Sequence, residues 1–285
     1  AGPAPSTVAA ILNRHGLVAP RRMKLRVARS PSPLTGACEP NDVWCVDFKG
    51  LFRLKGRGLY CYHLTISDLN SRYVLRCQAL GCTRYAHVYP VFLPAFREYG
   101  LPLVIRSDNG PPFASRAPGG LSRLSVWWIQ LGIHPERIAP AHPEQNGAHE
   151  RMHRNLKAEA TRPPERTLTA QQRRFSMWMR TYNDERPHEA LDMWTPSDCY
   201  STSSRAYPRR LAKPHYDTDA YVLVLQGQGQ ASFRGRILYV GHNLAGHQIA
   251  CQEVDDGIFE VCFFEYVIGT VDLRQPGRLR PERRG

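Results

Sequence analysis

The chain of 285 residues is long enough for about two domains, and 42% hydrophobic with 22% charged residues is the balance of a folded protein rather than a disordered one. Its 38 Lys and Arg against 25 Asp and Glu give a formal net charge of +13, which favours a polyanionic partner, most commonly nucleic acid. No apolar run approaches the roughly 20 residues of a membrane span and no signal peptide is visible, so we expect no membrane partner.

Cysteine usage points to the cytoplasm. Eight cysteines occur without a C-x-x-C pair, most of them within apolar stretches, which is typical of reduced core residues and predicts neither disulfides nor a zinc site. We therefore predict a cytoplasmic protein. The chain begins with Ala in what reads as mid-domain, so we expect further sequence before it in the natural protein.

The N-terminal residues 1–38 predict a DNA-binding segment. Ser6 to His15 read as a short helix that Ser6 caps and Gly16 ends. A basic stretch follows, with no acidic residue before Glu39. The candidate DNA-binding residues are Arg14, which lies in the helix, and Arg21, Arg22 and Lys24, which lie in the basic stretch. This combination favours the end of a helix-turn-helix unit with a basic linker; the alternative is an ordinary amphipathic helix with a solvated tail.

Residues 39–205 alternate between strand and helix patterns. Strands are predicted at Val43–Phe48, Tyr60–Asp68, Arg72–Ala79, Leu103–Arg106 and His134–Ala139. Helices are predicted at Val88–Tyr99, Leu121–Leu131, Gln145–Ala160 and Thr169–Asn183. Within these elements we expect Trp127, Trp128, Trp178 and Tyr182 to be core aromatics, and Asp68 to serve a polar turn.

The pattern changes after a Pro-rich, basic linker at 206–221. Residues 222–273 predict a small β-barrel, and residues 274–285 a basic tail. Its strands are predicted at Tyr221–Leu225, Ser232–Val240, Gln248–Glu253 and Ile258–Phe264.

Three acidic residues stand out by their context. Asp47 ends an apolar strand, Asp108 follows another, and Glu150 lies on a helix entered through Asn146-Gly147. Carboxylates at strand ends project into a crevice beside the sheet, and a helix crossing it can supply a third. Such a set of hard oxygen ligands suits Mg²⁺ or Mn²⁺. Two ions roughly 3.5–4 Å apart suit phosphoryl transfer, because they stabilise both the attacking and the leaving oxygen.

These motifs resemble a known family. Asp47, then Ser107-Asp108-Asn109-Gly110, then His142 to Arg151 with Glu150, look like the DDE core of the retroviral-integrase superfamily, with the closest likeness to bacterial insertion-sequence transposases of the IS481 type. The resemblance spans about residues 40 to 200 and continues through Tyr182-Asn183-Asp184-Glu185-Arg186-Pro187-His188-Glu189-Ala190-Leu191.

The resemblance implies an α/β fold. Its parts would be a ribonuclease-H-like core with a mixed sheet flanked by helices, a small C-terminal SH3-like β-barrel and a partial N-terminal helix-turn-helix segment. It further implies that Asp47, Asp108 and Glu150 hold two Mg²⁺ ions, for which Mn²⁺ can substitute. The implied activity is cleavage of element ends and joining of the 3′-hydroxyl to target DNA, by a homodimer or higher multimer on DNA.

Two alternatives concern the third carboxylate. The superfamily often separates the second Asp from the Glu by about 35 residues, a spacing that Glu144 fits better; Glu150 is preferred because the family's Glu follows the Asn-Gly turn. His149-Glu150-Arg151-Met152-His153 also matches the H-E-x-x-H pattern of zinc proteases, but no convincing third ligand follows. His149 or His153 would then lie near the DNA or the attacking group, or on the helix surface.

Residues around the triad are candidates for contacts with DNA. Asn109 shapes the loop after Asp108, and Asn146 forms the turn before the helix. Arg151, Arg154 and Lys157 recur at helical spacing and could follow phosphates, although a solvated basic face is the simpler alternative. Two rival functions are a nuclease of the same fold that only hydrolyses, and an inert DNA-binding protein descended from a transposase.

Overall fold

The computed structural model describes residues 34–56, 58–138, 147–274 and 279. The predicted N-terminal helix and several predicted site residues lie outside these ranges: Arg14, Arg21, Arg22, Lys24, Glu144 and Asn146. None of the helices within the described ranges is long and apolar enough to cross a membrane.

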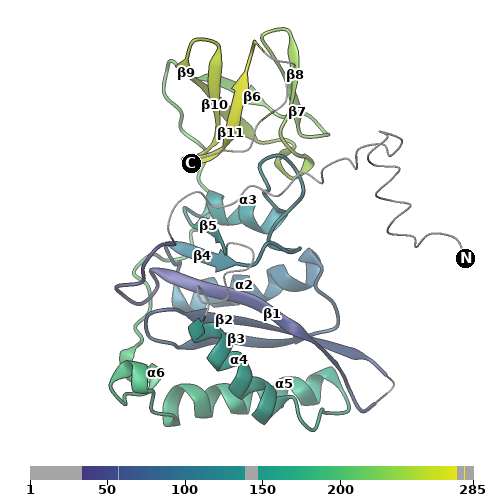
Figure 1. Cartoon of the computed structure of the whole chain (residues 1–285), viewed down its shortest axis with the longest axis vertical. Helices are drawn as coiled ribbons and strands as arrows, with labels where there is room; N and C mark the ends of the chain where they lie inside the picture. Colours follow the sequence, from purple (N-terminus) through teal and green to yellow (C-terminus); the bar gives the residue numbers. More distant parts are fainter. Residues whose placement is uncertain (1–33, 57, 139–146, 275–278, 280–285) are drawn as a thin grey trace, which may run out of the picture.

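A five-stranded mixed sheet forms the centre of the molecule (Figure 1). Its strands are β1 (Val43–Arg53), β2 (Tyr60–Asp68), β3 (Val74–Leu80), β4 (Val104–Ser107) and β5 (His134–Arg137). The order is β3-β2-β1-β4-β5; β1 runs antiparallel to β2 and parallel to β4, and β4 is parallel to β5. β2 agrees with its predicted range, whereas β1 runs five residues past the predicted end at Phe48, through an irregularity between Phe48 and Leu51. Asp47 therefore lies within a strand and not at its end.

Both faces of the sheet are buried. Alternate residues of a strand point to opposite faces, so Trp44 and Val46 pack in one apolar cluster with Leu64 and Ile66, whereas Cys61 belongs to another cluster on the opposite face. This pattern of burial accounts for the nearly continuous apolar sequence of the strands.

Two helices cover the first face (Figure 1). α2 (Tyr85–Tyr99) buries Val88, Phe92 and Phe96 at helical spacing, begins three residues before its predicted start and contains Pro90 and Pro94. α3 (Arg123–Gln130) starts in a capping box formed by Ser122 and Ser125 and buries both Trp127 and Trp128, as predicted.

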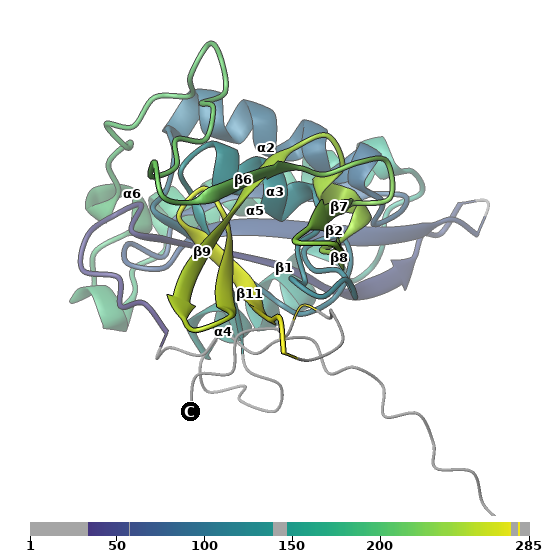
Figure 2. The same ribbon diagram turned by 90° about the horizontal axis from the view of Figure 1, so that it is seen from above.

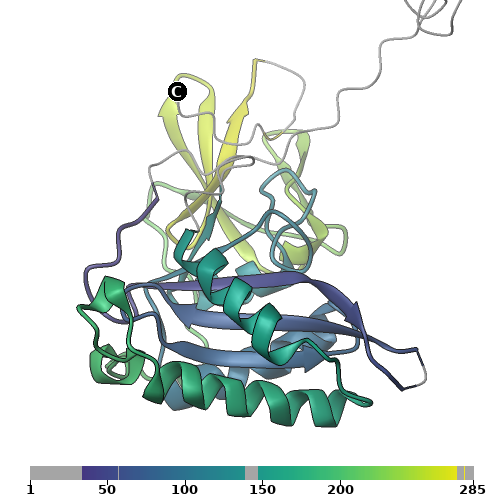
Figure 3. The same ribbon diagram turned by 60° about the horizontal axis from the view of Figure 1, so that its bottom comes forward.

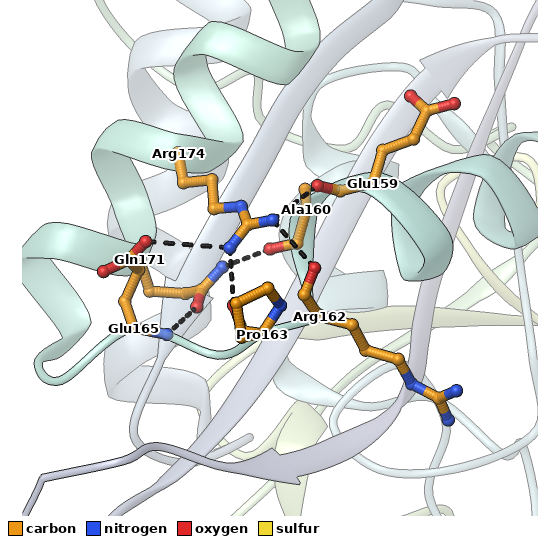
Figure 4. Close-up of polar contacts among 7 residues, drawn as sticks. All are labelled: Glu159, Ala160, Arg162, Pro163, Glu165, Gln171 and Arg174. Carbon is orange, nitrogen blue, oxygen red and sulfur yellow. Dashed lines mark hydrogen bonds and ion pairs between the residues drawn. The ribbon is translucent and has the colours of Figure 1, made fainter.

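The second face is covered by α4 (Gly147–Ala160) and α5 (Leu168–Arg180). Figure 3 shows α4 lying across the sheet and α5 along its β3 side. Met152 and Leu156 of α4 and Phe175 of α5 are buried in the apolar cluster beneath them. The connection between the helices is held by polar contacts (Figure 4): Arg174 donates to the carbonyls of Glu159, Arg162 and Pro163, and Gln171 Nε2 donates to the carbonyl of Ala160.

Side chains from α5 and from the turn after it also form hydrogen bonds with the backbone at the outer edge of β3. The side-chain amide of Gln172 accepts from the Ala79 amide and donates to the Cys77 carbonyl. Asn183 pairs in the same way with the amide and carbonyl of Val74, at 2.9 and 3.0 Å. A free sheet edge exposes unpaired backbone groups, so these two amides both complete β3 and fix the position of α5.

Short elements follow α5. They are a π-helical turn at Thr181–Glu185, a 3-10 turn at Glu189–Leu191 and α6 (Pro196–Cys199). The predicted helix Thr169–Asn183 therefore ends in a π-helical turn, within which Asn183 reaches the edge of β3.

The C-terminal residues form a separate β unit. Its strands are β6 (Tyr221–Val224), β7 (Gln230–Phe233), β8 (Arg236–Tyr239), β9 (Gln248–Asp255), β10 (Ile258–Phe263) and β11 (Tyr266–Asp272), with a 3-10 turn at His242–Leu244. A four-stranded sheet has the order β11-β10-β9-β6, and β7 pairs with β8. The predicted single strand Ser232–Val240 is wrong: the chain turns at Arg234 and Gly235, both at positive φ, and forms a hairpin.

The β unit packs directly on the part of the molecule that contains the five-stranded sheet (Figures 1 and 2). Leu121, Val126 and Ile129 of the α3 region belong to the same buried cluster as its Phe259 and Ile268. Asn243 donates to the carbonyl of Leu121, and the ring of His134 contacts that of Tyr266. The connection before the unit is also held, because the Arg205 guanidinium donates to the carbonyls of Pro102 and Gly132.

Candidate active site

Asp47 and Asp108 are placed side by side by the pairing of β1 with β4. The two strands are parallel, and Val46 is paired with Ser107, so each Asp follows a paired residue. Neighbouring strands lie about 4.8 Å apart and paired residues share a face. Asp47 and Asp108 therefore follow neighbouring positions of the two strands, and Cys45 and Val104 of the same strands pack together.

Asp47 is enclosed by α4 and β2. Its side chain is 17% exposed, and its Oδ2 lies 3.8 Å from Nδ1 of His153. Thr65, which is paired with Asp47 across β1 and β2, forms a 2.7 Å hydrogen bond through Oγ1 with Nε2 of the same imidazole. His153 is 1% exposed, which contradicts the alternative that it lies on the helix surface and places it beside Asp47.

Asp108 lies in a tight loop after β4. The Gly110 amide donates to Asp108 Oδ1 at 3.1 Å, and a Cβ at Gly110 would lie 3.2 Å from Oδ2, so glycine allows the loop to close around the carboxylate. Asn109 donates to the carbonyl of Ile138 at 2.7 Å, which ties the loop to the end of β5 and supports the predicted loop-shaping role of Asn109.

Electrostatics at this carboxylate favour a cation. Burial raises the pKa of Asp108, and only the Gly110 amide, among the groups described, works in the opposite direction. A carboxylate that burial alone makes costly to ionise gains most from a nearby positive charge. Carboxylates are also the donor type that Mg²⁺ and Mn²⁺ prefer, so the two Asp residues fit the predicted metal.

Position 150 lies on α4, one helical turn before His153. Residues three apart share a face of a helix, and His153 contacts the sheet at Asp47 and Thr65. The backbone of Glu150 is thus on the face of α4 nearest the two Asp residues, although its side chain is outside the described part of the chain. Within the described residues, no three His, Cys, Asp or Glu side chains gather closely enough to hold a metal.

Comparisons with known proteins agree with this geometry. Two family models described as integrase core domain match residues 37–143 and 131–196, which together cover more than half of the chain. The chain belongs to the DDE transposases of the integrase superfamily.

Individual relatives come from insertion elements. The chain is 30% identical over 187 residues to an uncharacterised 31.7 kDa protein of insertion element IS407 from Burkholderia multivorans, a match that covers 64% of each protein. It is 30% identical over 178 residues to a 39.2 kDa protein of IS476 from Xanthomonas euvesicatoria, over 62% of this chain and 49% of that one. The match thus spans about half to two thirds of these relatives. These insertion-element relatives agree with the family assignment, and the narrower IS481 type stays a prediction.

A solved structure is also similar. The catalytic core domain of HTLV-2 integrase in complex with magnesium, in a trimeric form, is 18% identical, with a TM-score of 0.45 over 58% of this chain and 100% of that chain. For this transposase, the observed mixed sheet flanked by helices and the integrase core models agree with the predicted ribonuclease-H-like core.

Other predicted residues have clear positions in the transposase. Arg151, Arg154 and Lys157 are all exposed on α4. Asp68 is structural, as predicted, because it accepts from the Asn41 and Ser71 amides. Trp178 and Tyr182 are buried.

The sequence did not single out Thr65 or identify the partners of His153. Thr65 could have been found only by pairing the two predicted strands in register, because nothing in its local sequence marks it. A second buried imidazole was also missed: His63, 3% exposed, has neither ring nitrogen hydrogen-bonded to a described residue, and burial with the charge of Lys157 lowers its pKa to about 4.

Proposed function

We propose that this protein is a transposase that cleaves the ends of a DNA element and joins the exposed 3′-hydroxyl to target DNA, with Asp47, Asp108 and Glu150 as its catalytic residues. The observation that carries the proposal is the register of β1 and β4, which sets Asp47 beside Asp108 under the helix that bears Glu150. A plain turn or cap role for the two Asp residues would not require this adjacency.

The carboxylates of Asp47, Asp108 and Glu150 would hold two divalent ions, preferably Mg²⁺ with Mn²⁺ as a substitute. Bound there, the ions would supply charge stabilisation for the oxygens that attack and leave the phosphorus. The remaining task of this chain is positioning. The Asp108 loop is fixed by Gly110 and Asn109, and α4 is fixed on the sheet by His153, so the backbone that bears the three residues is positioned before any ligand arrives.

Two transfers at phosphorus make up the proposed reaction. In the first, the oxygen of a water molecule attacks the phosphorus at the element end, the bond from phosphorus to the 3′-oxygen breaks, and that oxygen leaves as a 3′-hydroxyl. In the second, the 3′-hydroxyl oxygen attacks a target phosphodiester and displaces another 3′-oxygen. Each transfer breaks one ester bond and forms one bond to phosphorus.

The remaining predictions complete this proposal. DNA would be bound by Arg14, Arg21, Arg22, Lys24, Asn109, Asn146, Arg151, Arg154 and Lys157. The β unit of residues 222–273 would be an SH3-like barrel, and residues 1–38 the end of a helix-turn-helix unit. Because an element has two ends, a homodimer or higher multimer would act on DNA. Domain limits at 39–205 and 206–221 and a nucleoid location belong to the same proposal.

A strand-transfer assay tests the function. Labelled duplexes made from the DNA flanking the gene are incubated with the protein and Mg²⁺, and cleaved and joined products are separated. Joined product with the natural protein, and none with Asp108→Asn at near-normal DNA affinity, is the expected result. Cleavage without joining would favour the nuclease, and DNA binding without either would favour the inert descendant; full joining by Asp108→Asn would overturn the residue assignment.

A further inference from the structure

An arginine-rich pocket lies beside α4, outside the catalytic carboxylates. It has a volume of about 460 Å³, and its charged and polar lining includes Arg72, Arg151, Asn155, Tyr182, Arg186 and His188, with Glu189 as the one acidic member. Three guanidinium groups against Glu189 and the Glu159 carboxylate that pairs with Arg186 leave an excess of positive charge, which favours an anion.

The three arginines come from separate parts of the chain. Arg72 sits in the turn between β2 and β3, Arg151 in the first half of α4, and Arg186 just after the π-helical turn. Because elements distant in sequence contribute one arginine each, the pocket is a product of the fold and not of a basic run along one helix.

Two of the guanidinium groups are fixed in place and keep donors to spare. Arg72 Nη1 donates to the carbonyl of Leu69 at 2.6 Å, and Arg186 Nη2 donates to both carboxylate oxygens of Glu159 at 2.8 Å. A guanidinium has five N–H donors, so each retains donors for a ligand. Arg151 is exposed and makes no hydrogen bond with any described residue.

The pocket also contains a buried imidazole. Burial lowers the pKa of His188, and the charges of Arg186 and Arg72 lower it further. His188 Nε2 is buried and makes no hydrogen bond to a described residue. A hydrogen bond to the backbone of Tyr182 works in the opposite direction and occupies one ring N–H. An anion that enters the pocket would favour the protonated imidazole, which has a second N–H to donate.

The motif from Tyr182 to Leu191 builds this wall. Asn183 anchors it to Val74, and the Tyr182 ring packs against Trp178 and, edge-on, against His188. None of the three proposed catalytic residues lies in this segment, although both the family resemblance and the integrase core model that matches residues 131–196 include it. Holding Arg186 and His188 toward Arg72 and Arg151 is a task that its contacts fit.

We propose that this pocket binds a backbone phosphate of the DNA strand that lies along α4. The inference rests on the proposed function, because DNA is the polyanion on which that function acts. The β2–β3 turn follows the Trp44–Asp68 pair, three residues along β1 from the Asp47–Thr65 pair, which is roughly 10 Å at 3.3 Å per residue. A phosphate in the pocket would lie within a few nucleotides of the proposed catalytic carboxylates.

Salt-dependent DNA binding tests the pocket without any chemistry. The affinity for a labelled random-sequence duplex is measured by fluorescence anisotropy without divalent metal, from low to physiological salt. Arg72→Asn removes one guanidinium, and asparagine accepts the left-handed backbone at this position, where φ is 65°. Each lost phosphate contact should flatten the log–log salt slope by about 0.9. Arg151→Gln, at an exposed helix position, should do the same and guards against a folding defect at residue 72.

Arg173→Gln is the matched control, because Arg173 is an exposed arginine of α5 outside the pocket lining and should leave the slope unchanged. If Arg72→Asn and Arg151→Gln had the same slope as the natural protein, the pocket would not bind a DNA phosphate. The proposed strand transfer would be unaffected by that result. A flattened slope with joining preserved in Asp108→Asn would leave the pocket and overturn the triad. A change of oligomeric mass with an unchanged slope would mean that an acidic segment of a second copy fills the pocket instead.

Discussion

His153 and Thr65 are joined by a 2.7 Å hydrogen bond between Nε2 and Oγ1, although 88 residues separate them in the chain. Thr65 is paired in register with Asp47, and His153 lies one helical turn after Glu150. The bond therefore fixes the helix that bears Glu150 against β2, the strand paired with the one that bears Asp47. His153 and Thr65 act on the proposed reaction through this positioning.

Thr65→Val tests that positioning role. Valine keeps the shape of threonine but removes the hydroxyl, so a buried ring nitrogen loses its partner, at a cost of about 1–3 kcal/mol. We expect a lower rate of strand joining, a slightly lower Tm and unchanged affinity for DNA. Thr65→Ser retains the hydroxyl and should recover most of the rate. A serine variant as slow as the valine variant would show that the hydrogen bond does not matter.

Asn183→Leu should destabilise the protein without touching the carboxylates. The Asn183 amide satisfies both the amide and the carbonyl of Val74 at the outer edge of β3, and leucine leaves both unpaired beneath the π-helical turn. The cost should be about 2–6 kcal/mol, at 1–3 kcal/mol for each of the two unsatisfied groups. Chemical denaturation measures it, and Arg180→Gln at an exposed site of α5 is a control expected to stay within about 0.5 kcal/mol of the natural protein. If Asn183→Leu lost as little free energy of unfolding as the control variant, Asn183 would not stabilise the edge of β3.

His63 should make the stability of the fold depend on pH. Burial and Lys157 lower its pKa from 6.5 to about 4, so between these values the unfolded chain binds more protons and stability falls as the pH falls. The contribution is fully present above about pH 6.5 and is lost toward pH 4. From pH 7 to pH 5 the loss is about 2 kcal/mol.

His63→Phe isolates this contribution. The site is lined by Phe52 and Phe175, so a phenyl ring suits it and cannot be protonated. We expect the variant to lose less stability than the natural protein between pH 7 and pH 5, in urea titrations at both pH values. Parallel losses in the two proteins would mean that other groups carry the acid sensitivity.

Much of the core could be predicted because its signals are local. The range of β2 follows from an apolar run between turn residues, and α3 from a serine cap and helical spacing. Where local signals are missing or ambiguous, the predictions differ from the structure. α2 starts at Tyr85 with no side-chain cap on Arg84, and β1 continues past Gly50, whose positive φ of 91° lies in an irregularity that reads as a strand end.

Site geometry depends on pairings between distant residues. The sequence identified Asp47 and Asp108 separately, but only the register of β1 and β4 sets them side by side. It found the strand containing Thr65 and the helix containing His153, yet their bond depends on how α4 crosses the sheet. The pocket at Arg72 is likewise formed by three separate segments, so no single sequence motif predicts it.

The third carboxylate can be assigned by comparing Glu150→Gln with Glu144→Gln. α4 is regular from Gly147, which puts position 150 one turn before His153 on the face that meets Asp47 and Thr65. Glu150→Gln should lose strand transfer by a factor of 100 or more, on the order of the loss of one strong electrostatic contact in an active site. Glu144→Gln should keep most of the activity.

The zinc alternative is tested on the same proteins. His153 is bonded to Thr65 and faces Asp47, so replacing it should disturb α4 and reduce joining, whereas the metal content of the purified protein should not change. Mn²⁺ should raise the Tm of the natural protein more than that of Glu150→Gln, a readout that needs no activity. Stoichiometric zinc that disappears in a His149→Ala, His153→Ala double variant would overturn the assignment. Loss of activity in Glu144→Gln with full activity in Glu150→Gln would move the third ligand and leave the proposed transfer reaction in place.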